Sequence, residues 1–456
     1  MDRIRIEGGR PLAGRVRIAG AKNAALPALA AALLTDEPVV FANLPAVADV
    51  RTMLRLLRQL GAEVGDVRGL FEPGADAEPP QVAVRAGAIG SIEAAYDLVR
   101  TMRASVLVLG PLLARAGRAR VSLPGGCAIG ARPIDMHLEG LRRMGARVNL
   151  QHGYVDASCE RLAGADYTFP GVTVTGTENL MAAAALARGV TTLRNCAREP
   201  EVTDLAGLLR AMGARLTGDG TDVITIEGVE RLRGAEHRVI PDRIEAGTYL
   251  AAAAMTAAPD GAVTIAHCEP AHLGAPLDVL RAAGARVDVG RGELTVRGRS
   301  AASAAGQRKA DAALRAIRVQ TAPYPGFATD LQAQFMALCT QSTGASTIVE
   351  TIFESRFLHA LELGRMGADI RVEGNASIVT GPSPLMGTDV LASDLRASAC
   401  LVLAGLVASG ETTVHRVYHL DRGYERMEAK LRGLGAAIER IPGRVAQAAA
   451  PQGTGR

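Results

Sequence analysis

Apolar residues along this chain form two recurring patterns that predict buried helices and short strands. Alanine- and leucine-rich stretches predict helices at residues 24–34, 106–114, 180–187, 250–257, 331–338 and 399–407. Short runs of β-branched residues predict strands at 190–193, 263–265 and 412–414, and further strands at 147–150 and 286–289. Because helices and strands alternate along the chain, we predict the α/β class.

One motif, Leu-x-x-(Leu/Met/Ala)-Gly-Ala, occurs six times and predicts six helix ends. Its glycine would supply the left-handed backbone conformation that closes a helix. The six glycines are Gly61, Gly145, Gly213, Gly284, Gly367 and Gly435. Each of the last three lies 222 or 223 residues after one of the first three. The chain is therefore predicted to be a duplication, with three repeated α/β units in each of two similar domains.

Alignment of the two halves places the domain boundary near Ile240. We predict a first lobe at residues 20–240 and a second lobe made of residues 1–19 and 241–443, with the leading strands around Gly8 paired to the second lobe. The chain would then cross twice between the lobes and form a hinge beside a ligand cleft. Residues 444–456 are rich in alanine, glutamine and glycine, and we expect them to be disordered.

Composition narrows the class of protein. With 456 residues, 48% hydrophobic content and a net charge of +4, the sequence is typical of a soluble globular protein. Basic residues are not clustered, which argues against nucleic-acid binding. No signal peptide or long apolar span is recognisable, so we expect a cytoplasmic protein without membrane contact. The six cysteines form no CxxC pair, and no nucleotide-binding fingerprint occurs, so we expect neither a metal nor a cofactor.

Residues 123–133, Leu-Pro-Gly-Gly-Cys-Ala-Ile-Gly-Ala-Arg-Pro, place Cys127 in a glycine-rich turn five residues before Arg132. Glycines let a backbone approach a ligand closely, and a nearby guanidinium stabilises a thiolate. This combination predicts a reactive cysteine. The alternative is a tight turn that holds an inert thiol.

Polar residues recur at the predicted helix starts, among them Lys22, Asn23, Asp330 and Arg396. Free N–H groups and the helix dipole attract anions at such places, and a cation strengthens the attraction. A simpler alternative exists for each residue. Asp330 and Asp394 could be N-caps, while Arg356, Arg396 and Arg422 could form local ion pairs with Glu354, Asp394 and Asp421.

Several segments resemble the UDP-N-acetylglucosamine enolpyruvyl transferase family. Besides the Cys127 loop, they are residues 20–27 (Gly-Ala-Lys-Asn-Ala-Ala-Leu-Pro), 96–105, 241–245, 329–334 and 421–426. The resemblance extends from Met1 to about Arg440 and implies the two-domain inside-out α/β barrel of the enolpyruvyl transferases. It also implies an enzyme that transfers the enolpyruvyl group of phosphoenolpyruvate to the 3-hydroxyl of UDP-N-acetylglucosamine. Phosphate would be released in this first committed step of peptidoglycan synthesis.

The resemblance also implies roles for individual residues. Lys22, Arg132 and Arg422 would hold the phosphate, with Arg356 and Arg396 around the carboxylate. Cys127 would be the general acid and covalent-adduct residue, and Asp330 the base on the sugar hydroxyl. The residues expected to contact the nucleotide sugar are Asn23, Arg103, Arg132, Pro133, Ile134, Asp135, Met136, Asp330 and Ile352.

Three segments depart from the family pattern. Residues 172–179 differ from the common Ser-Val-Gly form, Tyr324 and Ala328 replace a histidine and a proline, and residues 65–81 form an expected surface insertion. Two alternatives remain: an enzyme like 5-enolpyruvylshikimate-3-phosphate synthase, against which Cys127 argues, and a non-catalytic UDP-sugar-binding regulatory paralogue. The joint presence of Cys127, Lys22 and Asp330 argues against the paralogue.

Overall fold

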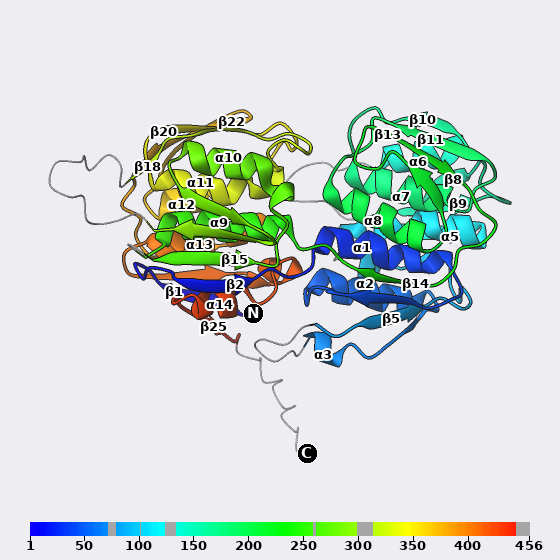
Figure 1. The fold of residues 1–456 in the computed structure, drawn as a ribbon, viewed down its shortest axis with the longest axis horizontal. Coiled ribbons are helices and arrows are strands. Elements are labelled where there is room, and N and C mark those ends of the chain that lie inside the picture. The colour runs from blue at the N-terminus through cyan, green and yellow to red at the C-terminus, as the bar shows by residue number, and fades with distance from the viewer. Residues whose placement is uncertain (72–78, 101, 124–133, 259–260, 299–312, 444–456) are drawn as a thin grey trace, which may run out of the picture.

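The computed structural model describes residues 1–71, 79–100, 102–123, 134–258, 261–298 and 313–443. Two lobes lie side by side, and each carries helices in its interior and strands on its outside (Figure 1). The buried hydrophobic residues form two clusters, one within residues 21–239 and one within residues 4–18 and 244–438. The hydrophobic core is therefore divided between these two parts of the chain.

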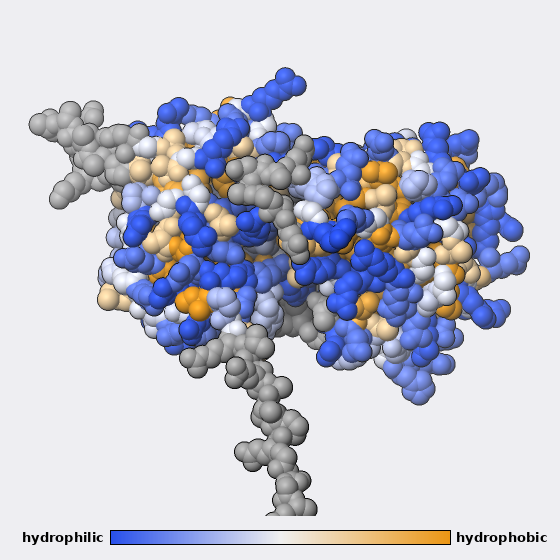
Figure 2. All heavy atoms as spheres, turned by 90° about the horizontal axis from the view of Figure 1, so that it is seen from below, coloured by the Kyte–Doolittle hydropathy of each residue, from blue (hydrophilic) through white to orange (hydrophobic). Residues whose placement is uncertain are grey.

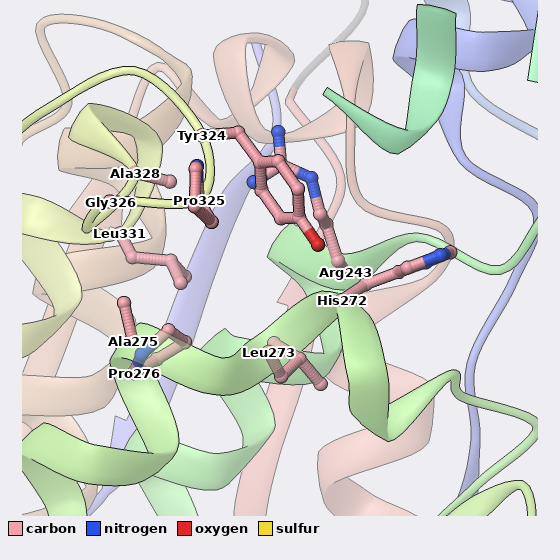
Figure 3. Close-up of a pocket in the computed structure, with 10 residues that line it drawn as sticks. All are labelled: Arg243, His272, Leu273, Ala275, Pro276, Tyr324, Pro325, Gly326, Ala328 and Leu331. Atoms are coloured by element: carbon pink, nitrogen blue, oxygen red, sulfur yellow. The ribbon is translucent and has the colours of Figure 1, made fainter. Parts of the chain in front are cut away.

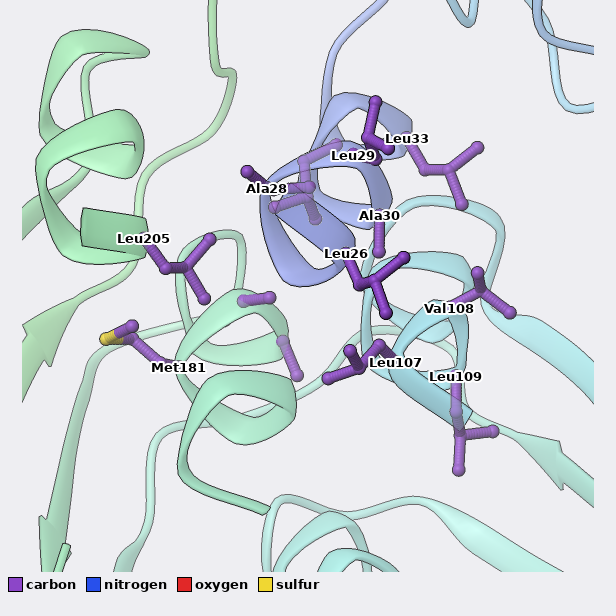
Figure 4. Close-up of a cluster of buried hydrophobic side chains, with 14 of the residues drawn as sticks. Leu26, Ala28, Leu29, Ala30, Leu33, Leu107, Val108, Leu109, Met181 and Leu205 are labelled. Carbon is purple, nitrogen blue, oxygen red and sulfur yellow. The ribbon is translucent and has the colours of Figure 1, made fainter. Parts of the chain in front are cut away.

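The first helix of each unit is largely buried. These helices are α1 (Lys22–Ala31), α5 (Leu109–Ala116) and α7 (Val174–Ala184) in the first lobe, and α9 (Arg243–Thr256), α11 (Gln332–Thr340) and α13 (Leu395–Val407) in the second. They are rich in alanine and most have no polar face, which is the pattern of a helix surrounded by other elements. Figure 4 shows Leu26 and Leu29 of α1 in one such cluster with Leu107, Met181 and Leu205.

The second helix of each unit lies between this interior and the surface. These helices are α2 (Ala48–Gln59), α6 (Asp135–Arg143), α8 (Pro200–Ala211), α10 (Gly274–Ala282), α12 (Leu358–Arg365) and α14 (Met427–Gly433). Each ends just before one of the six Gly-Ala pairs, and the φ angles of these glycines lie between 88° and 102°. The predicted helix ends are therefore confirmed.

Three sheets of four strands cover the first lobe. Their order is β14-β3-β5-β4, β6-β7-β9-β8 and β10-β11-β13-β12. The strands are β3 (Val39–Ala42), β4 (Glu63–Val64), β5 (Val82–Arg85), β6 (Glu93–Ala94), β7 (Arg118–Ser122), β8 (Arg147–Gln151), β9 (Tyr154–Ser158), β10 (Asp166–Thr168), β11 (Val190–Arg194), β12 (Arg215–Thr217), β13 (Val223–Glu227) and β14 (Ala235–Arg238).

Three further sheets cover the second lobe, in the order β16-β17-β15-β2, β18-β20-β22-β21 and β23-β24-β1-β25, with β19 also paired to β20. The strands are β1 (Arg3–Glu7), β2 (Gly14–Arg17), β15 (Ala262–Ala266), β16 (Arg286–Gly290), β17 (Glu293–Arg297), β18 (Leu314–Arg315), β19 (Arg318–Gln320), β20 (Ser342–Val349), β21 (Asp369–Glu373), β22 (Ala376–Gly381), β23 (Asp389–Leu391), β24 (Glu411–His415) and β25 (Ala437–Ile441). The N-terminal strands β1 and β2 thus belong to sheets of the second lobe.

Each sheet combines a parallel edge strand with antiparallel neighbours, and the sheet of β20 has β19 as a second parallel strand. In the first lobe, for example, β14 runs parallel to β3 and β5 runs antiparallel to it. Strand residues alternate between buried and exposed positions, so one face packs on the helices and the other meets solvent. The face seen from below in Figure 2 is mostly hydrophilic, with apolar side chains in separate patches.

The two chain crossings between the lobes lie beside each other and are hydrogen-bonded. Ala21 N–H donates to the carbonyl of Ile240 (2.7 Å), and Asp242 N–H donates to the carbonyl of Ala19 (2.9 Å). At Gly20, between these bonds, an added Cβ would lie 1.8 Å from the carbonyl oxygen of Asn43. Only glycine fits there, so the crossing depends on that residue.

The cost of a side chain at a helix-end glycine can be tested at a position where backbone strain acts without steric crowding. Gly213 has a φ of 102°, and no atom lies within 4 Å of a Cβ added there. Gly213→Ala should therefore lower the free energy of unfolding by about 1 kcal/mol through backbone strain alone. Gly207 is the matched control, because it lies inside α8 with equally free space. Gly207→Ala should raise the free energy of unfolding by about 1 kcal/mol in urea titrations. Shifts of the same sign in both variants would contradict this assignment.

Candidate active site

Two cations predicted to bind phosphate meet at one buried carboxylate. Lys22 begins α1, and its Nζ lies 3.3 Å from Asp49 Oδ2. Arg422 ends the 3₁₀ helix η6 (Val417–Arg422) in the other lobe, and its Nε donates to Asp49 Oδ1 at 3.0 Å. Asp49 is only 4% exposed. A single carboxylate therefore links cations that come from both lobes.

A second carboxylate, that of Asp330, lies between two buried arginines of the second lobe. Asp330 is in the short 3₁₀ helix η5 (Thr329–Leu331) before α11. Arg356 Nη2 donates to its Oδ1 at 2.6 Å, and Arg396 Nη2 donates to its Oδ2 at 3.1 Å. The guanidinium of Arg396 also lies over the ring of Tyr424, with 5.4 Å between Cζ and the ring centroid.

These two groups influence each other electrostatically. Burial lowers the pKa of Lys22, Asp49 opposes this effect, Arg396 and Arg422 lower the pKa further, and Asp330 raises it. Burial would raise the pKa of Asp330, but Arg396 and Arg356 outweigh burial and hold that pKa well below its usual range. Asp330 is consequently ionised at neutral pH and is a weak base in this arrangement.

The local alternatives for these residues are wrong in four of the five cases. Arg356 and Arg396 pair with Asp330, and Arg422 pairs with Asp49, which is 373 residues away. Asp330 makes no capping hydrogen bond. Asp394, by contrast, is an N-cap, because its Oδ1 accepts from the N–H groups of Arg396 and Ala397. The pairing partners could not be deduced from neighbouring letters in the sequence.

Glu350, which the sequence analysis did not single out, fixes two segments of the predicted site. Its carboxylate is 2% exposed and accepts hydrogen bonds from the hydroxyls of Thr321 and Thr329, each at 2.8 Å. It also accepts from the N–H of Ile352 at 2.8 Å. Thr329 in turn accepts from Arg356 Nη1 at 2.8 Å. Glu350 therefore holds the segment of Ile352 directly, and through Thr329 it holds the segment of Asp330 and contacts Arg356.

The predicted nucleotide-sugar contacts in the first lobe lie at other helix starts. Asn23 is the second residue of α1, Arg103 begins η2 (Arg103–Val108), and Ile134 is the N-cap residue of α6. Asp135 and Met136 follow in the first turn of α6, and the carbonyl of Met136 accepts a hydrogen bond from the Tyr167 hydroxyl at 3.1 Å.

A buried hydrogen-bond chain connects α6 to the segment at 172–179. Asn179 Oδ1 accepts from Gly110 N–H, so its amide NH₂ faces His137 Nδ1 at 3.0 Å. His137 Nε2 then carries the proton and faces Thr175 Oγ1 at 3.3 Å. Burial and then Arg103 lower the pKa of His137 to about 4, so the ring is neutral. The hydroxyl proton of Thr175 is left available to another acceptor.

Three predicted residues, Cys127, Arg132 and Pro133, lie outside the described residues. The remaining five cysteines are free thiols, four of them buried. Burial raises the pKa of Cys196 and Cys268 to about 11 and that of Cys339 to about 12, and it also raises the pKa of Cys159 and Cys400. None of these five has the electropositive surroundings of a reactive thiolate.

A small pocket opens beside the segment that leads to Asp330. Figure 3 shows Arg243, His272 and Tyr324 on its wall, with Ala328 and Leu331 nearby. Both departures from the family pattern in this segment, Tyr324 and Ala328, thus line the pocket. The pocket also borders the junction of the lobes, because Arg243 Nε donates to Glu201 at 3.0 Å and Tyr324 N–H donates to Glu199 at 3.2 Å.

Within the described ranges, no group of three or more His, Cys, Asp or Glu side chains is arranged to hold a metal ion. In the same part of the chain, no helix has the length and apolar character needed to cross a bilayer.

Comparison with known proteins identifies the family. A sequence profile of EPSP synthase (3-phosphoshikimate 1-carboxyvinyltransferase) matches residues 6–431. The chain belongs to this family. The inside-out α/β fold predicted from the sequence is also confirmed, because the enolpyruvyl transferase NikO from Streptomyces tendae superposes with a TM-score of 0.83, at 29% identity over 96% of this chain and 99% of that one. EPSP synthase from Acinetobacter baumannii shares the fold, with a TM-score of 0.72 at 18% identity over 97% and 100% of the two chains.

Several more similar relatives carry one name, UDP-N-acetylglucosamine 1-carboxyvinyltransferase. The protein from Koribacter versatilis is 54% identical over 97% of both chains. Those from Solibacter usitatus and Halorhodospira halophila are 55% and 52% identical over 97% of this chain and 100% of their own. The resemblance predicted from the motifs is therefore confirmed across almost the whole sequence.

The burial of the described thiols can be tested by their reactivity. In the folded chain at pH 8, Cys196, Cys268, Cys339 and Cys400 should react with iodoacetamide at least about 100-fold more slowly than in urea, because burial disfavours their thiolates. Peptide mass spectrometry over a time course measures each rate. Rapid alkylation of any of these four thiols without unfolding would contradict the burial described for it.

Proposed function

We propose that this enzyme transfers the enolpyruvyl group of phosphoenolpyruvate to the 3-hydroxyl of UDP-N-acetylglucosamine and releases phosphate. The observation that carries the proposal is the convergence of Lys22, Asp330, Arg356, Arg396 and Arg422 from two lobes. The relatives named for this reaction, at 52–55% identity, support the same assignment. The product would serve peptidoglycan synthesis in the cytoplasm.

The charges of the site suit phosphoenolpyruvate. This substrate carries a phosphate and a carboxylate, with about three negative charges at neutral pH. Lys22 and Arg422, together with Arg132, would bind the phosphate. Arg356 and Arg396 would bind the carboxylate, and the fork of a guanidinium is suited to such a partner. Two small molecules are then the only partners that the reaction requires, without nucleic acid, membrane or cofactor.

The chemistry is an addition followed by an elimination. Asp330 takes the proton of the sugar 3-hydroxyl, whose oxygen forms a bond to C2 of phosphoenolpyruvate, while Cys127 delivers a proton to the methylene carbon C3. In the elimination, the Cys127 thiolate takes a proton back from C3 and the bond between C2 and the phosphate oxygen breaks, which restores the double bond. Phosphate carries away the bonding electrons.

The structure suggests how Asp330 becomes basic enough for this role. While Arg356 and Arg396 both hold its carboxylate, the pKa of Asp330 is too low for efficient proton removal. A substrate carboxylate bound to those arginines would neutralise part of their charge and raise the proton affinity of Asp330. The base would then be activated only after phosphoenolpyruvate has bound.

The nucleotide sugar would lie between the lobes. Asn23, Arg103 and the segment Ile134, Asp135 and Met136 would contact it from the first lobe, together with Arg132 and Pro133. Ile352 and Asp330 would contact it from the second lobe. The free hydroxyl proton of Thr175 offers a further donor near α6.

The direct test is an assay of phosphate release from phosphoenolpyruvate with different acceptors. Release should require UDP-N-acetylglucosamine, and shikimate 3-phosphate should not replace it. Release with shikimate 3-phosphate would assign the chain to the other activity of the family. Binding of UDP-N-acetylglucosamine without any phosphate release would indicate a non-catalytic paralogue.

Asp330→Asn separates the base from a structural residue. Asparagine keeps the size and can still accept a hydrogen bond, but it cannot take the proton. Turnover should fall by about 10²–10⁴-fold, while the affinity for the UDP-sugar measured by calorimetry stays nearly unchanged. Turnover close to that of the unchanged enzyme would exclude Asp330 as the base, and Glu354 would be the next candidate.

The role of Cys127 can be tested with the epoxide fosfomycin. We expect rapid alkylation at Cys127 alone, because Arg132 should favour its thiolate. Burial disfavours the thiolate form of the five described cysteines. Intact-mass and peptide mapping identify the site, and Cys127→Ser should abolish the modification. Modification at another cysteine, or at none, would refute the assignment.

A further inference from the structure

We propose that Asp49 is a positioning residue that holds Lys22 and Arg422 together as one phosphate-binding pair across the junction of the two lobes. The inference rests on the proposed function, since it concerns the phosphate of the same substrate. No motif marked Asp49 in the sequence, where it is an ordinary acidic residue near the start of a helix. Its importance becomes visible only from its two partners.

The contacts of Asp49 use both of its oxygens. Oδ1 accepts from Arg422 Nε at 3.0 Å, and Oδ2 lies 3.3 Å from Lys22 Nζ and 3.5 Å from Arg422 Nη2. An acid in the first turn of α2 would benefit from the helix dipole even when it faces solvent. Asp49 is instead buried, and burial of a carboxylate is costly unless cations compensate it. The burial therefore indicates a role beyond support of α2.

The contact between the lobes is reinforced three residues further along the chain. Glu425 Oε2 accepts from the N–H of Ala46 at 2.7 Å, just before α2 begins. The segment 422–425 is thus attached twice to the segment 46–49, once through a side-chain pair and once through the backbone. This double attachment fixes where Arg422 stands relative to Lys22.

Without Asp49, the positive charges of Lys22 and Arg422 would repel each other in partly buried surroundings. Lys22 lies within the electrostatic influence of four side chains: Asp49 on α2 and Asp330 on η5 favour its charged form, whereas Arg396 on α13 and Arg422 on η6 disfavour it. The carboxylate of Asp242 accepts only the backbone N–H of Lys22, at 3.3 Å. Asp49 is the largest of the favourable influences, so its removal would lower the pKa of Lys22 further.

The test uses Asp49→Asn and Asp49→Glu in the phosphate-release assay. Asp49→Asn keeps the size but removes the charge. It should raise the KM for phosphoenolpyruvate about tenfold or more, leave the KM for UDP-N-acetylglucosamine within about twofold, and shift the alkaline limb of kcat/KM to lower pH. Asp49→Glu keeps the charge but moves it. It should retain the alkaline limb while still raising the KM for phosphoenolpyruvate.

Asp166→Asn is the matched control, because Asp166 forms a two-point pair with Arg194 on an exposed strand. It should leave both KM values and the pH profile unchanged. Melting temperatures and UDP-sugar binding verify that each variant is folded. If Asp49→Asn does not fold, the selective rise in KM in Asp49→Glu decides the question.

The inference is overturned if Asp49→Asn keeps the KM for phosphoenolpyruvate and the alkaline limb, because Asp49 would then serve only α2. A lower KM would also overturn it, since Asp49 would then merely compete with the phosphate. An equal rise in both KM values in Asp49→Glu would show a general disturbance of the fold. Failure of the proposed function would appear differently, as absence of UDP-sugar-dependent phosphate release in the unchanged enzyme.

Discussion

The candidate site depends on the pairing of buried and partly buried charges. Four of the predicted substrate-binding cations are held by two carboxylates: Asp49 holds Lys22 and Arg422, and Asp330 holds Arg356 and Arg396. An unpaired charge in these surroundings would be energetically costly. The two carboxylates therefore stabilise the cations at the positions where the substrate would bind.

The repeated fold explains why these charges meet. Two of the largely buried first helices begin at the candidate site, α1 with Lys22 and α13 with Leu395 and Arg396. The two crossings run beside each other at Ala21 and Ile240, and Asp242 accepts the backbone N–H of Lys22. The duplication thus turns helix starts that are distant in sequence into one site. Glu350 then anchors the segments that carry Asp330 and Ile352.

The sequence predicted those parts of the fold that are determined by the type of each residue and its near neighbours. The six glycines at helix ends require a left-handed backbone, and the alanine-rich helices require burial on most sides, so both could be derived from residue type alone. The sequence patterns predicted about two strands per unit, whereas five of the sheets contain four strands and one contains five. The parallel edge strands are short, such as β6 with two residues, and one of them, β14, comes from the far end of its lobe. Such strands leave little periodicity to detect.

The same limit applies to the candidate site, where residue types could be predicted but their pairing could not. Polar residues at predicted helix starts and the family resemblance singled out Lys22, Asp330 and the arginines that meet the two carboxylates, but the partners lie 26 to 373 residues away along the chain. Local pairing of Arg422 with Asp421 was a reasonable alternative, yet Asp421 pairs with Arg440 and Arg422 reaches Asp49. Asp49 and Glu350 have no signal in one sequence, because what distinguishes them is burial beside particular partners.

The most direct test of the account is a crystal structure of the Asp330→Asn variant with UDP-N-acetylglucosamine and phosphoenolpyruvate bound. The account predicts that the phosphate lies within hydrogen-bond distance of Lys22 and Arg422, with the substrate carboxylate at Arg356 and Arg396 and the sugar 3-hydroxyl beside residue 330. A phosphate bound elsewhere, with neither Lys22 nor Arg422 in contact with it, would contradict the account.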